Sequence, residues 1–575
     1  MLAVSLERLT YDLPTRILTG PHSMNARWAY IRLQSLHVSR MMSDTRRSRA
    51  IQHEVLQKKI ALCADSRFGR DHHLSSIRTV ADFQRQIPIT DFEYVRPYVE
   101  DVQNGDTQAL FGPRTRLLMF AMTSGTTEKP KHIPVTDDFV RGYKRGWKIW
   151  GLKTHTDHID LARKDYVHLA GDWQESRTPS GVWCGSISGL AAETRPAIVR
   201  RPFIVPPAVG KISDWTDRQY LTLRLSIPSR RVGMIITANP LTLVKLAQLA
   251  DQNKETLLRD MRDGTITMPG GDGENGAESI APNVRRRIRP VASRRVRELE
   301  QIVERTGELL PRDFWPELSV VGVWMGGSVG AFVPDVRRLY GDCAFRDHGL
   351  SASEGRMTIP MQDESNAGLL DFTSNFYEFI PVAEFGNDHP TLLEAHELVE
   401  GESYYILLTN SGGLFRYNIH DVVQCVGFEG QTPLLAFLHK GVHCSNMTGE
   451  KLTEYQVATA VGEAFTQSNQ SVQTVMLVPV MGSIPRYKLL IESGSDSQTG
   501  KLAEAIDARL SALNCEYDNR LKTRRLLPLL PHSVPDGTWT RLREQKIADR
   551  GGTQEQYKHT FLLTSDEILT ELANA

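Results

Sequence analysis

A six-residue apolar run, Leu117 to Met122, leads directly into segment 123–136, which reads TSGTTEKPKHIPVT. The apolar run predicts a buried strand over 117–122. Four hydroxyl side chains then surround Gly125, namely Thr123, Ser124, Thr126 and Thr127. Backbone N–H groups and hydroxyls in a small glycine-containing loop after a strand can wrap an anion, and nearby lysines add positive charge. The segment therefore favours a phosphate-binding loop, with ATP as its ligand.

The hydroxyl-rich loop on its own also fits an ordinary surface turn with capping hydroxyls. It lacks the GxxxxGK[ST] spacing of a Walker loop. Both interpretations stay open from this segment alone, and two further segments bear on the choice.

The second segment is 322–357; a buried strand is predicted over 320–324, and a glycine turn follows it. Gly327 and Ser328 lie in that turn, and a helix is predicted over 334–340. A glycine turn at the carboxyl end of a strand suits a flat ring lying on the backbone. Further on, Ser353 precedes Glu354, and hard oxygen ligands of this kind can hold Mg²⁺. The alternative for Glu354 is a solvated loop carboxylate.

The third segment, 413–426, reads GLFRYNIHDVVQCV. Asp421 precedes an apolar strand-like run, and a carboxylate at a strand end can accept hydrogen bonds from a ribose diol. An aspartate in a hairpin turn is the alternative interpretation.

Taken in this order, the three segments resemble the Gretchen Hagen three family of acyl acid-amido synthetases. That family has an SSGTS-type phosphate loop, a YASSE-type segment and an LYRYRxGD-type segment. The corresponding residues here read TSGTT at 123–127, LSASE at 350–354 and LFRYNIHD at 414–421. Further matches are KHIP at 131–134, FYEFIP at 376–381, GEKLTE at 449–454 and QYK at 556–558. The resemblance covers about residues 50–565.

Three positions depart from the family pattern. Leu350 stands where the family has tyrosine, Asn418 replaces its second arginine, and His420 replaces its glycine. His420 is expected to crowd a turn that prefers small residues. These departures leave Glu354, Asp421 and the hydroxyl loop in place.

The resemblance implies the site residues and their ligands. Thr123, Ser124, Gly125, Thr126 and Thr127 would bind the phosphates of ATP. Glu354 would hold Mg²⁺, Asp421 the ribose, and Gly327, Ser328 and Ser353 the adenine side. Lys558 would be the catalytic charge that the C-terminal region contributes, with Lys451 as a second candidate.

The resemblance also implies an α/β, adenylate-forming-enzyme-like fold. We expect a large N-terminal domain over 1–435, with β-sheets flanked by helices, and a small mobile α+β cap over 436–575. The expected activity is ATP-dependent adenylation of a carboxylic acid, followed by transfer of the acyl group to an amine or amino acid. Segment 181–189, with Trp183, is a candidate wall of the acyl pocket, although core packing explains Trp183 equally well.

Two other activities fit parts of the pattern. An acyl-CoA synthetase would share the adenylation step and use a thiol in the second step, although GEKLTE and QYK match the amide-forming family better. A degenerate nucleotide-binding scaffold would account for Asn418 and His420.

Composition indicates small-molecule partners. The 575 residues carry a formal net charge of 0, which gives no broad electrostatic case for nucleic acid or a membrane surface. No run of about 18 apolar residues predicts a membrane span, and the N-terminal residues lack the apolar core of a secretory signal. The six cysteines are scattered without CxxC spacing, which favours reduced thiols and a cytoplasmic location.

Overall fold

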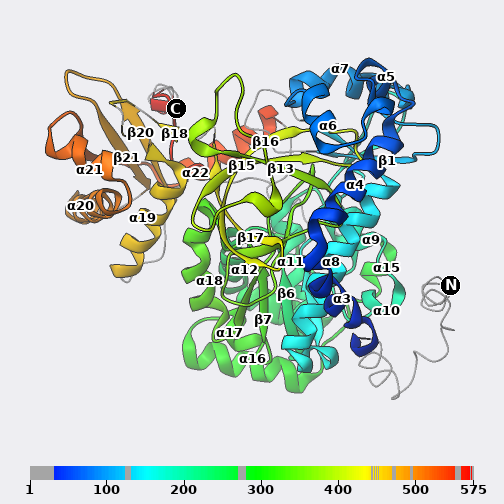
Figure 1. Cartoon of the computed structure of the whole chain (residues 1–575). Coiled ribbons are helices and arrows are strands. Elements are labelled where there is room, and N and C mark those ends of the chain that lie inside the picture. Colours follow the sequence, from blue (N-terminus) through cyan, green and yellow to red (C-terminus); the bar gives the residue numbers. More distant parts are fainter. Residues whose placement is uncertain are drawn as a thin grey trace.

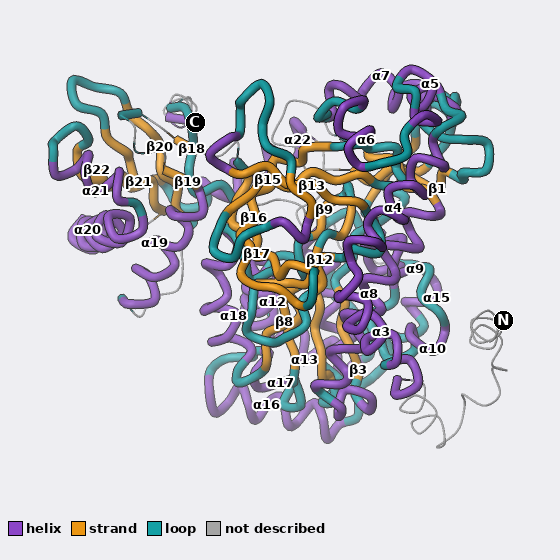
Figure 2. The backbone as a smooth tube through the Cα atoms, viewed as in Figure 1, coloured by secondary structure: helices purple, strands orange, loops and turns teal. Residues whose placement is uncertain are grey.

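The computed structural model describes residues 31–122, 131–269, 280–441, 444–445, 447–448, 450, 452–468, 474–492, 496–550, 559–566, 568–569 and 572. Figure 1 shows a large body in which helices surround several sheets, with a smaller group of C-terminal elements at one side. The same arrangement is visible in the backbone tube of Figure 2, where the strands of the large body lie inside its helices.

Five helices open the described chain. They are α3 (Leu36–Asp44), α4 (Ser48–Cys63), α5 (Arg67–Asp71), α6 (Val80–Gln86) and α7 (Phe92–Gln103). Thr79 begins α6 with a capping box, since its side chain accepts from the Asp82 N–H while the Asp82 carboxylate accepts from the Thr79 N–H.

The predicted strand at 117–122 is β1 (Leu117–Met122), which confirms the sequence interpretation. It pairs antiparallel with β2 (His132–Thr136) and parallel with β5 (Trp183–Gly185). The short β4 (Ser176–Arg177) completes this four-stranded sheet beside β5. The start of the hydroxyl loop is thereby fixed, because Met122 is the last residue of a strand with neighbours on both sides.

A second sheet has four parallel strands in the order β3-β6-β7-β8. Its strands are β3 (Asp165–His168), β6 (Val232–Ile236), β7 (Val320–Val323) and β8 (Ala344–Asp347). The helices of this region are α8 (Asp137–Asp157), α9 (Ile187–Glu193), α10 (Ala197–Arg200), α11 (Trp215–Ser226), α12 (Pro240–Gln252), α13 (Lys254–Asp263), α15 (Pro282–Arg285), α16 (Ser293–Thr306), α17 (Pro311–Phe314) and α18 (Val333–Tyr340). Ligands of open parallel sheets bind outside the carboxyl ends of the strands, so this edge is where a site is expected.

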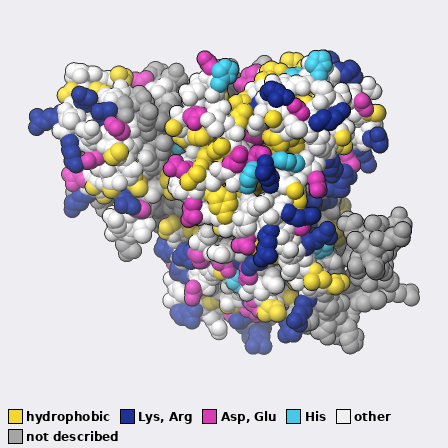
Figure 3. Space-filling model, viewed as in Figure 1, with side chains coloured by type: hydrophobic (Ala, Val, Ile, Leu, Met, Phe, Trp, Pro, Cys, Tyr) yellow, Lys and Arg dark blue, Asp and Glu magenta, His cyan; other side chains and the backbone are white. Residues whose placement is uncertain are grey.

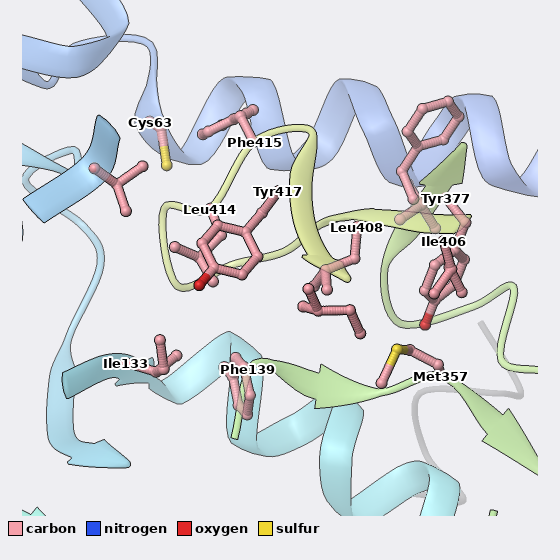
Figure 4. Close-up of a cluster of buried hydrophobic side chains, with 14 of the residues drawn as sticks. Cys63, Ile133, Phe139, Met357, Tyr377, Ile406, Leu408, Leu414, Phe415 and Tyr417 are labelled. Carbon is pink, nitrogen blue, oxygen red and sulfur yellow. The ribbon is translucent and has the colours of Figure 1, made fainter. Parts of the chain in front are cut away.

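The third sheet is antiparallel and has seven strands in the order β11-β12-β17-β16-β15-β13-β14. Its strands are β11 (Thr358–Ile359), β12 (Ala367–Leu370), β13 (Phe376–Pro381), β14 (Leu393–Glu394), β15 (Ser403–Thr409), β16 (Tyr417–Glu429) and β17 (Thr432–Lys440). Its side chains Leu408 and Tyr417, with Phe415 from the turn between β15 and β16, pack in one cluster with Cys63 of α4 and Phe139 of α8 (Figure 4). One hydrophobic core therefore joins the N-terminal helices to this sheet.

The C-terminal elements have a core of their own. They are β18 (Cys444–Ser445), β19 (Leu452–Thr453), α19 (Glu454–Gln467), β20 (Val475–Val480), β21 (Arg486–Glu492), α20 (Asp496–Leu513), α21 (Cys515–Lys522), β22 (Leu527–Val534) and α22 (Thr538–Arg550). Their core reaches the large body at Ala331 and Phe332, where a side chain on Gly462 of α19 would come within 3.3 Å of Ala331. The division at residues 435 and 436 stays a prediction, and it falls within β17.

The predicted α/β class with helix-flanked sheets is confirmed. Positive and negative side chains are interspersed on the face shown in Figure 3. Among the described residues, none of the helices combines the length and apolar character needed to cross a membrane.

A buried charge network fastens α4, α8 and the turn that precedes β16. Asp138 is 4% exposed, and its Oδ2 lies 3.0 Å from the Lys59 Nζ, which is also buried. Ser411 donates to the same Asp138 oxygen at 2.5 Å, and Lys59 donates to the Ser411 hydroxyl at 2.6 Å. Burial opposes the charge of Asp138, but Lys59, Lys58 and Ser411 outweigh it and hold the pKa of this carboxyl well below its usual range.

We expect Asp138→Asn to lower the free energy of unfolding by about 3 kcal/mol, because Lys59 would remain buried without a negative partner. Urea denaturation measures the effect. The control is the adjacent Asp137→Asn, whose carboxylate pairs with Arg141 at the surface and whose loss should cost less than about 1 kcal/mol. Because the folded-state pKa of Asp138 lies below the unfolded value, its contribution is complete at neutral pH and disappears as the pH falls below about 4. Equal losses for both variants would contradict this role of the network.

Candidate active site

The segment that holds Glu354 is a tight hairpin lying against the end of β1. Its strands are β9 (Ser351–Ala352) and β10 (Gly355–Arg356), so Ser353 and Glu354 form the turn. The Ser353 hydroxyl donates to the carbonyl of Met122, the residue before the hydroxyl loop, at 3.1 Å. Asn410 donates to the Glu354 carbonyl at 2.6 Å. The end of β1 and the hairpin, more than 200 residues apart in the chain, are therefore neighbours.

Glu354 is a buried carboxylate, 8% exposed, that forms no ion pair within the described part of the chain. Burial raises its pKa, an effect that Lys440 opposes and Asp421 reinforces. Mg²⁺ is usually held by one or two carboxylates together with substrate phosphates and water. A single buried glutamate next to the end of β1, where the predicted phosphate loop begins, fits that donor set, although the described residues contain no group of three or more metal-ligating side chains.

The predicted glycine turn after β7 is present, and its geometry requires glycine. Gly327 has φ +64°, and a Cβ there would lie 2.6 Å from the ring of Phe437. Ser328 follows at the start of a short 3₁₀ turn that leads into α18. The turn is thus held against β17, the strand that ends at Lys440.

Asp347, at the end of β8, ties this turn to the Glu354 segment. One of its oxygens accepts from the N–H of Met325 and the other from the N–H of Gly349, both at 2.5 Å. Burial raises the pKa of Asp347 to about 7, although these two N–H groups favour the charged form. The carboxyl ends of β7 and β8 are therefore linked through one side chain.

Asp421 lies inside β16 and faces Lys440 on β17. The two residues are register partners, and the Lys440 Nζ lies 3.0 Å from the Asp421 Oδ1. That oxygen is buried and makes no hydrogen bond of good geometry, so it can still accept from a ligand hydroxyl. Burial would lower the pKa of Lys440, but the carboxylates of Asp421 and Glu354 outweigh burial and raise it. The charge of Lys440 is therefore stabilised both by Asp421, the predicted ribose ligand, and by Glu354, the predicted magnesium ligand.

His420 occupies the left-handed backbone region, with φ +60°, where glycine is the unstrained residue. This agrees with the expectation that a small residue suits the position. Its ring packs edge-on against Phe385, with 6.0 Å between ring centroids. Its carbonyl accepts from the N–H of Gly441 at 2.7 Å, which fixes the chain just after Lys440.

The structure brings together Gly327, Ser328, Ser353, Glu354 and Asp421 around β17 and the end of β1. The loop residues Thr123, Ser124, Gly125, Thr126 and Thr127 and the two lysines Lys451 and Lys558 lie outside the described residues. Their roles stay predictions.

Sequence reasoning missed Lys440 and Asp347. The role of Lys440 depends on a cross-strand pairing that no local sequence pattern predicts. Its position at the end of an apolar strand was the one local feature that pointed to it. Asp347 lies four residues after a cysteine in a run that reads as an ordinary strand end.

Three family models match the chain and together span most of it. They are the GH3 family N-terminal domain over residues 37–345, the GH3 family central domain over 368–440 and the GH3 family C-terminal domain over 455–567. The chain belongs to the GH3 family. GH3 is the family that the sequence motifs resembled, so that prediction is confirmed.

A curated GH3 relative, "Probable indole-3-acetic acid-amido synthetase GH3.1" from Oryza sativa subsp. japonica, is 23% identical over 535 residues, covering 88% of this chain and 86% of the relative. The solved "GH3.15 acyl acid amido synthetase" has a TM-score of 0.80 at 17% identity, covering 93% of this chain and 95% of that one. A 2-hydroxyisobutyryl-CoA ligase in the postadenylation state has a TM-score of 0.56 at 11% identity, over 92% and 91% of the two chains. The predicted adenylate-forming fold is thereby confirmed, and the predicted enzyme class agrees with the GH3 relatives.

The strain at His420 can be measured with two substitutions. Both His420→Gly and His420→Ala remove the ring, but only glycine adopts φ +60° without a Cβ penalty. We expect the glycine variant to be more stable than the alanine variant by about 1 kcal/mol in urea denaturation. Equal stabilities, or a more stable alanine variant, would contradict the assignment of strain to this position.

Asp421→Asn tests the predicted ribose contact. The change retains an acceptor oxygen but loses the negative charge, so we expect the dissociation constant for AMP to rise about tenfold, or about 1.4 kcal/mol. Isothermal titration calorimetry measures it. Asp388→Asn, at an exposed loop position, should leave the constant unchanged, and an unchanged constant for Asp421→Asn would remove Asp421 from the nucleotide site.

Proposed function

We propose that this GH3 protein is an ATP-dependent acyl acid-amido synthetase. In the first step a carboxylate oxygen of the acid attacks the α-phosphorus of ATP, forming acyl-AMP and releasing pyrophosphate. In the second step an amine attacks the acyl carbon, forming the amide and releasing AMP and a proton. The acid and the amine are small molecules.

The observation that best supports this proposal is the arrangement of Glu354, Lys440 and Asp421. Two carboxylates flank one ammonium group directly beside the hairpin that touches the start of the hydroxyl loop. Opposite charges fixed before the substrate arrives stabilise a developing charge without reorganisation. Lys440 can accordingly offset negative charge that develops on the α-phosphate, while Asp421 accepts from the ribose.

We further propose Mg²⁺ as the partner of Glu354 and of the ATP phosphates. When bound, the ion would neutralise phosphate charge and orient the α-phosphate. Glu354 would hold it from the hairpin turn, and the Ser353 hydrogen bond to Met122 would keep that turn beside the phosphates.

The C-terminal region would supply the second set of charges. Lys558 is our candidate to reach the nucleotide, with Lys451 as the second, and the cap over 436–575 is proposed to move between the two steps. The cytoplasm is the proposed location, supported by Cys63, Cys184, Cys343, Cys425 and Cys515, which are free thiols.

An acyl-CoA synthetase activity would share the first step. The GH3 family match over 37–345, 368–440 and 455–567 favours an amine acceptor over a thiol. A nucleotide-binding scaffold, the other alternative, would bind ATP without releasing pyrophosphate.

The deciding assay incubates the protein with ATP, Mg²⁺, a panel of carboxylic acids and hydroxylamine as a surrogate amine. We expect acid-dependent pyrophosphate, AMP and hydroxamate in equal amounts. Glu354→Gln should abolish turnover while the protein stays folded. ATP binding without pyrophosphate release from any acid would favour the scaffold, and turnover with coenzyme A but with no amine would favour the thioester ligase.

Lys558→Ala tests the contribution of the C-terminal region. Loss of a cation that stabilises transition-state charge should lower kcat about 100-fold while leaving the AMP dissociation constant unchanged. Lys522→Ala, at a position whose side chain is 74% exposed on α21, is the control and should retain full activity. An unchanged kcat for Lys558→Ala would contradict the predicted role.

A further inference from the structure

A small cavity lies at the carboxyl end of β3, away from the Glu354–Lys440–Asp421 group. Its volume is ≈ 20 Å³. A water needs roughly 10–15 Å³ of such space, so the cavity accepts one or two water-sized atoms. Its apolar wall includes Val205, Pro206 and Val209, and its polar wall includes His168, Arg195 and Gln219.

The polar wall is basic. None of the side chains that line the cavity is acidic, and Arg195 forms no ion pair with any carboxylate in the described part of the chain. Its guanidinium lies over the Phe203 ring at 3.9 Å and donates to the His168 Nδ1 at 2.7 Å. Burial lowers the pKa of Arg195 to about 10, so the group remains a cation at neutral pH. Arg195 is only partly buried, and a partly buried guanidinium beside a cavity, without a carboxylate partner in the described part of the chain, is a favourable position for an anion.

Gln219 adds a second unmet polar group. It is 1% exposed, lines the cavity from α11, and its side-chain oxygen has no hydrogen-bond partner. Buried polar groups in folded proteins are nearly always paired. A carboxylate cannot donate to this oxygen, so Gln219 marks the cavity as polar but adds nothing to the case for an anion.

The cavity is one helix away from the end of β1. Gly185, at the end of β5, pairs with Ala121, two residues before the hydroxyl loop. Helix α9 then runs from Ile187 to Glu193, a length of about 10 Å at 1.5 Å per residue, and Arg195 follows. Lys144 of α8 donates to the Thr194 carbonyl at 3.3 Å, so α8 lies alongside. His168 ends β3 and His348 directly follows β8 of the same sheet, so the cavity lies on the sheet edge that also leads into the Glu354 hairpin.

We propose that the acid substrate carries a second anionic group at the end opposite the carboxylate that is activated, and that Arg195 binds this group in the cavity. The inference rests on the proposed function. The activated carboxylate meets ATP at the hydroxyl loop, and an extended chain along α9 brings its other end to Arg195. The two oxygens of a carboxylate correspond to the one or two water-sized atoms that the cavity accepts, and a carboxylate pairs well with a guanidinium.

Arg356 is the competing location for a second anion. It is 1% exposed, lies over Trp147 at 4.4 Å and donates to the His348 carbonyl at 2.5 Å. Its Nε and Nη1 atoms have no hydrogen-bond partner. It is, however, two residues from Glu354, where a second anion would meet a buried carboxylate and the carboxylate being activated. Arg195 avoids that repulsion.

The test compares acids of equal length that differ only in the second carboxylate. Hydroxamate formation is measured with adipic, suberic and sebacic acids and with hexanoic, octanoic and decanoic acids. We expect the wild type to prefer the best diacid over its monoacid by at least about tenfold in kcat/KM. Arg195→Met should lower kcat/KM for that diacid by about tenfold or more and leave the monoacid within about threefold, and Arg195→Lys should retain part of the preference.

Lys211→Met is the matched control, because Lys211 is an exposed cation near the cavity that donates to Gln174 instead. It should leave the preference unchanged. Direct binding of suberate by calorimetry, without ATP, supplies a readout that does not need turnover, and Arg195→Met should abolish it.

Several results would overturn the inference: turnover of monoacids with no diacid preference, equal losses for both acids in Arg195→Met, or a preference that Arg356→Met removes and Arg195→Met does not. Suberate binding that depends on Arg195, without turnover of any acid, would instead sustain the anion site and refute the proposed function. If the protein neither turns over a diacid nor binds suberate, the anion site is refuted.

Discussion

The Asp138–Lys59–Ser411 network is the constraint on which the position of the nucleotide site depends. Removing an ammonium and a carboxylate from water costs several kcal/mol for each ion, and only close pairing with further hydrogen bonds offsets it. Here Asp138 belongs to α8, which begins directly after β2, and Ser411 belongs to the turn that leads into β16. The network therefore fixes the distance between the strand pair flanking the hydroxyl loop and the strand that contains Asp421.

With the strands fixed by this network, the site is assembled by contacts between strand ends rather than by any one segment. Asp347 joins the ends of β7 and β8, and the Ser353 hydroxyl joins the Glu354 hairpin to β1. Lys440 then joins β17 to β16 through Asp421. Each link uses a backbone group or a single ion pair. The site therefore depends more on the register of the strands than on which side chains surround the linked groups.

Local patterns predicted the elements well where burial alone decides them. The run 117–122 is apolar at every position, which made its assignment as a buried strand unambiguous. Glu354 and Asp421 were found because their motifs resemble those of a family. A glutamate or an aspartate in a loop would otherwise pass for a solvated carboxylate, and the structure shows both to be buried.

Long-range pairing was beyond local patterns. Lys440 is meaningful only because the register of β16 and β17 places it opposite Asp421. The Arg195 cavity is built from β3, α11 and two connecting segments, so its residues are scattered and no spacing rule joins them. The resemblance to the family predicted only that a small residue suits position 420, and the left-handed φ of His420 supplies the physical reason.

The two halves of the proposed site differ in how their charges are balanced. One half would carry out the reaction, and the other would select the acid substrate. Around the nucleotide, Lys440 already has two carboxylates, so ATP meets a site whose charges are fixed and nearly compensated before binding. Around the cavity, Arg195 contacts a neutral histidine and an aromatic ring, and none of the carboxylates that the structure describes pairs with it. A site whose charges are already paired can accept any acid, because it interacts with the phosphates of ATP and not with the rest of the acid. An uncompensated cation discriminates, because only a ligand that brings an anion repays its desolvation. A chain with no net charge can thus select its acid through one locally unbalanced positive charge, that of Arg195. This charge would lie at the end of the acid opposite the carboxylate that forms the new bond.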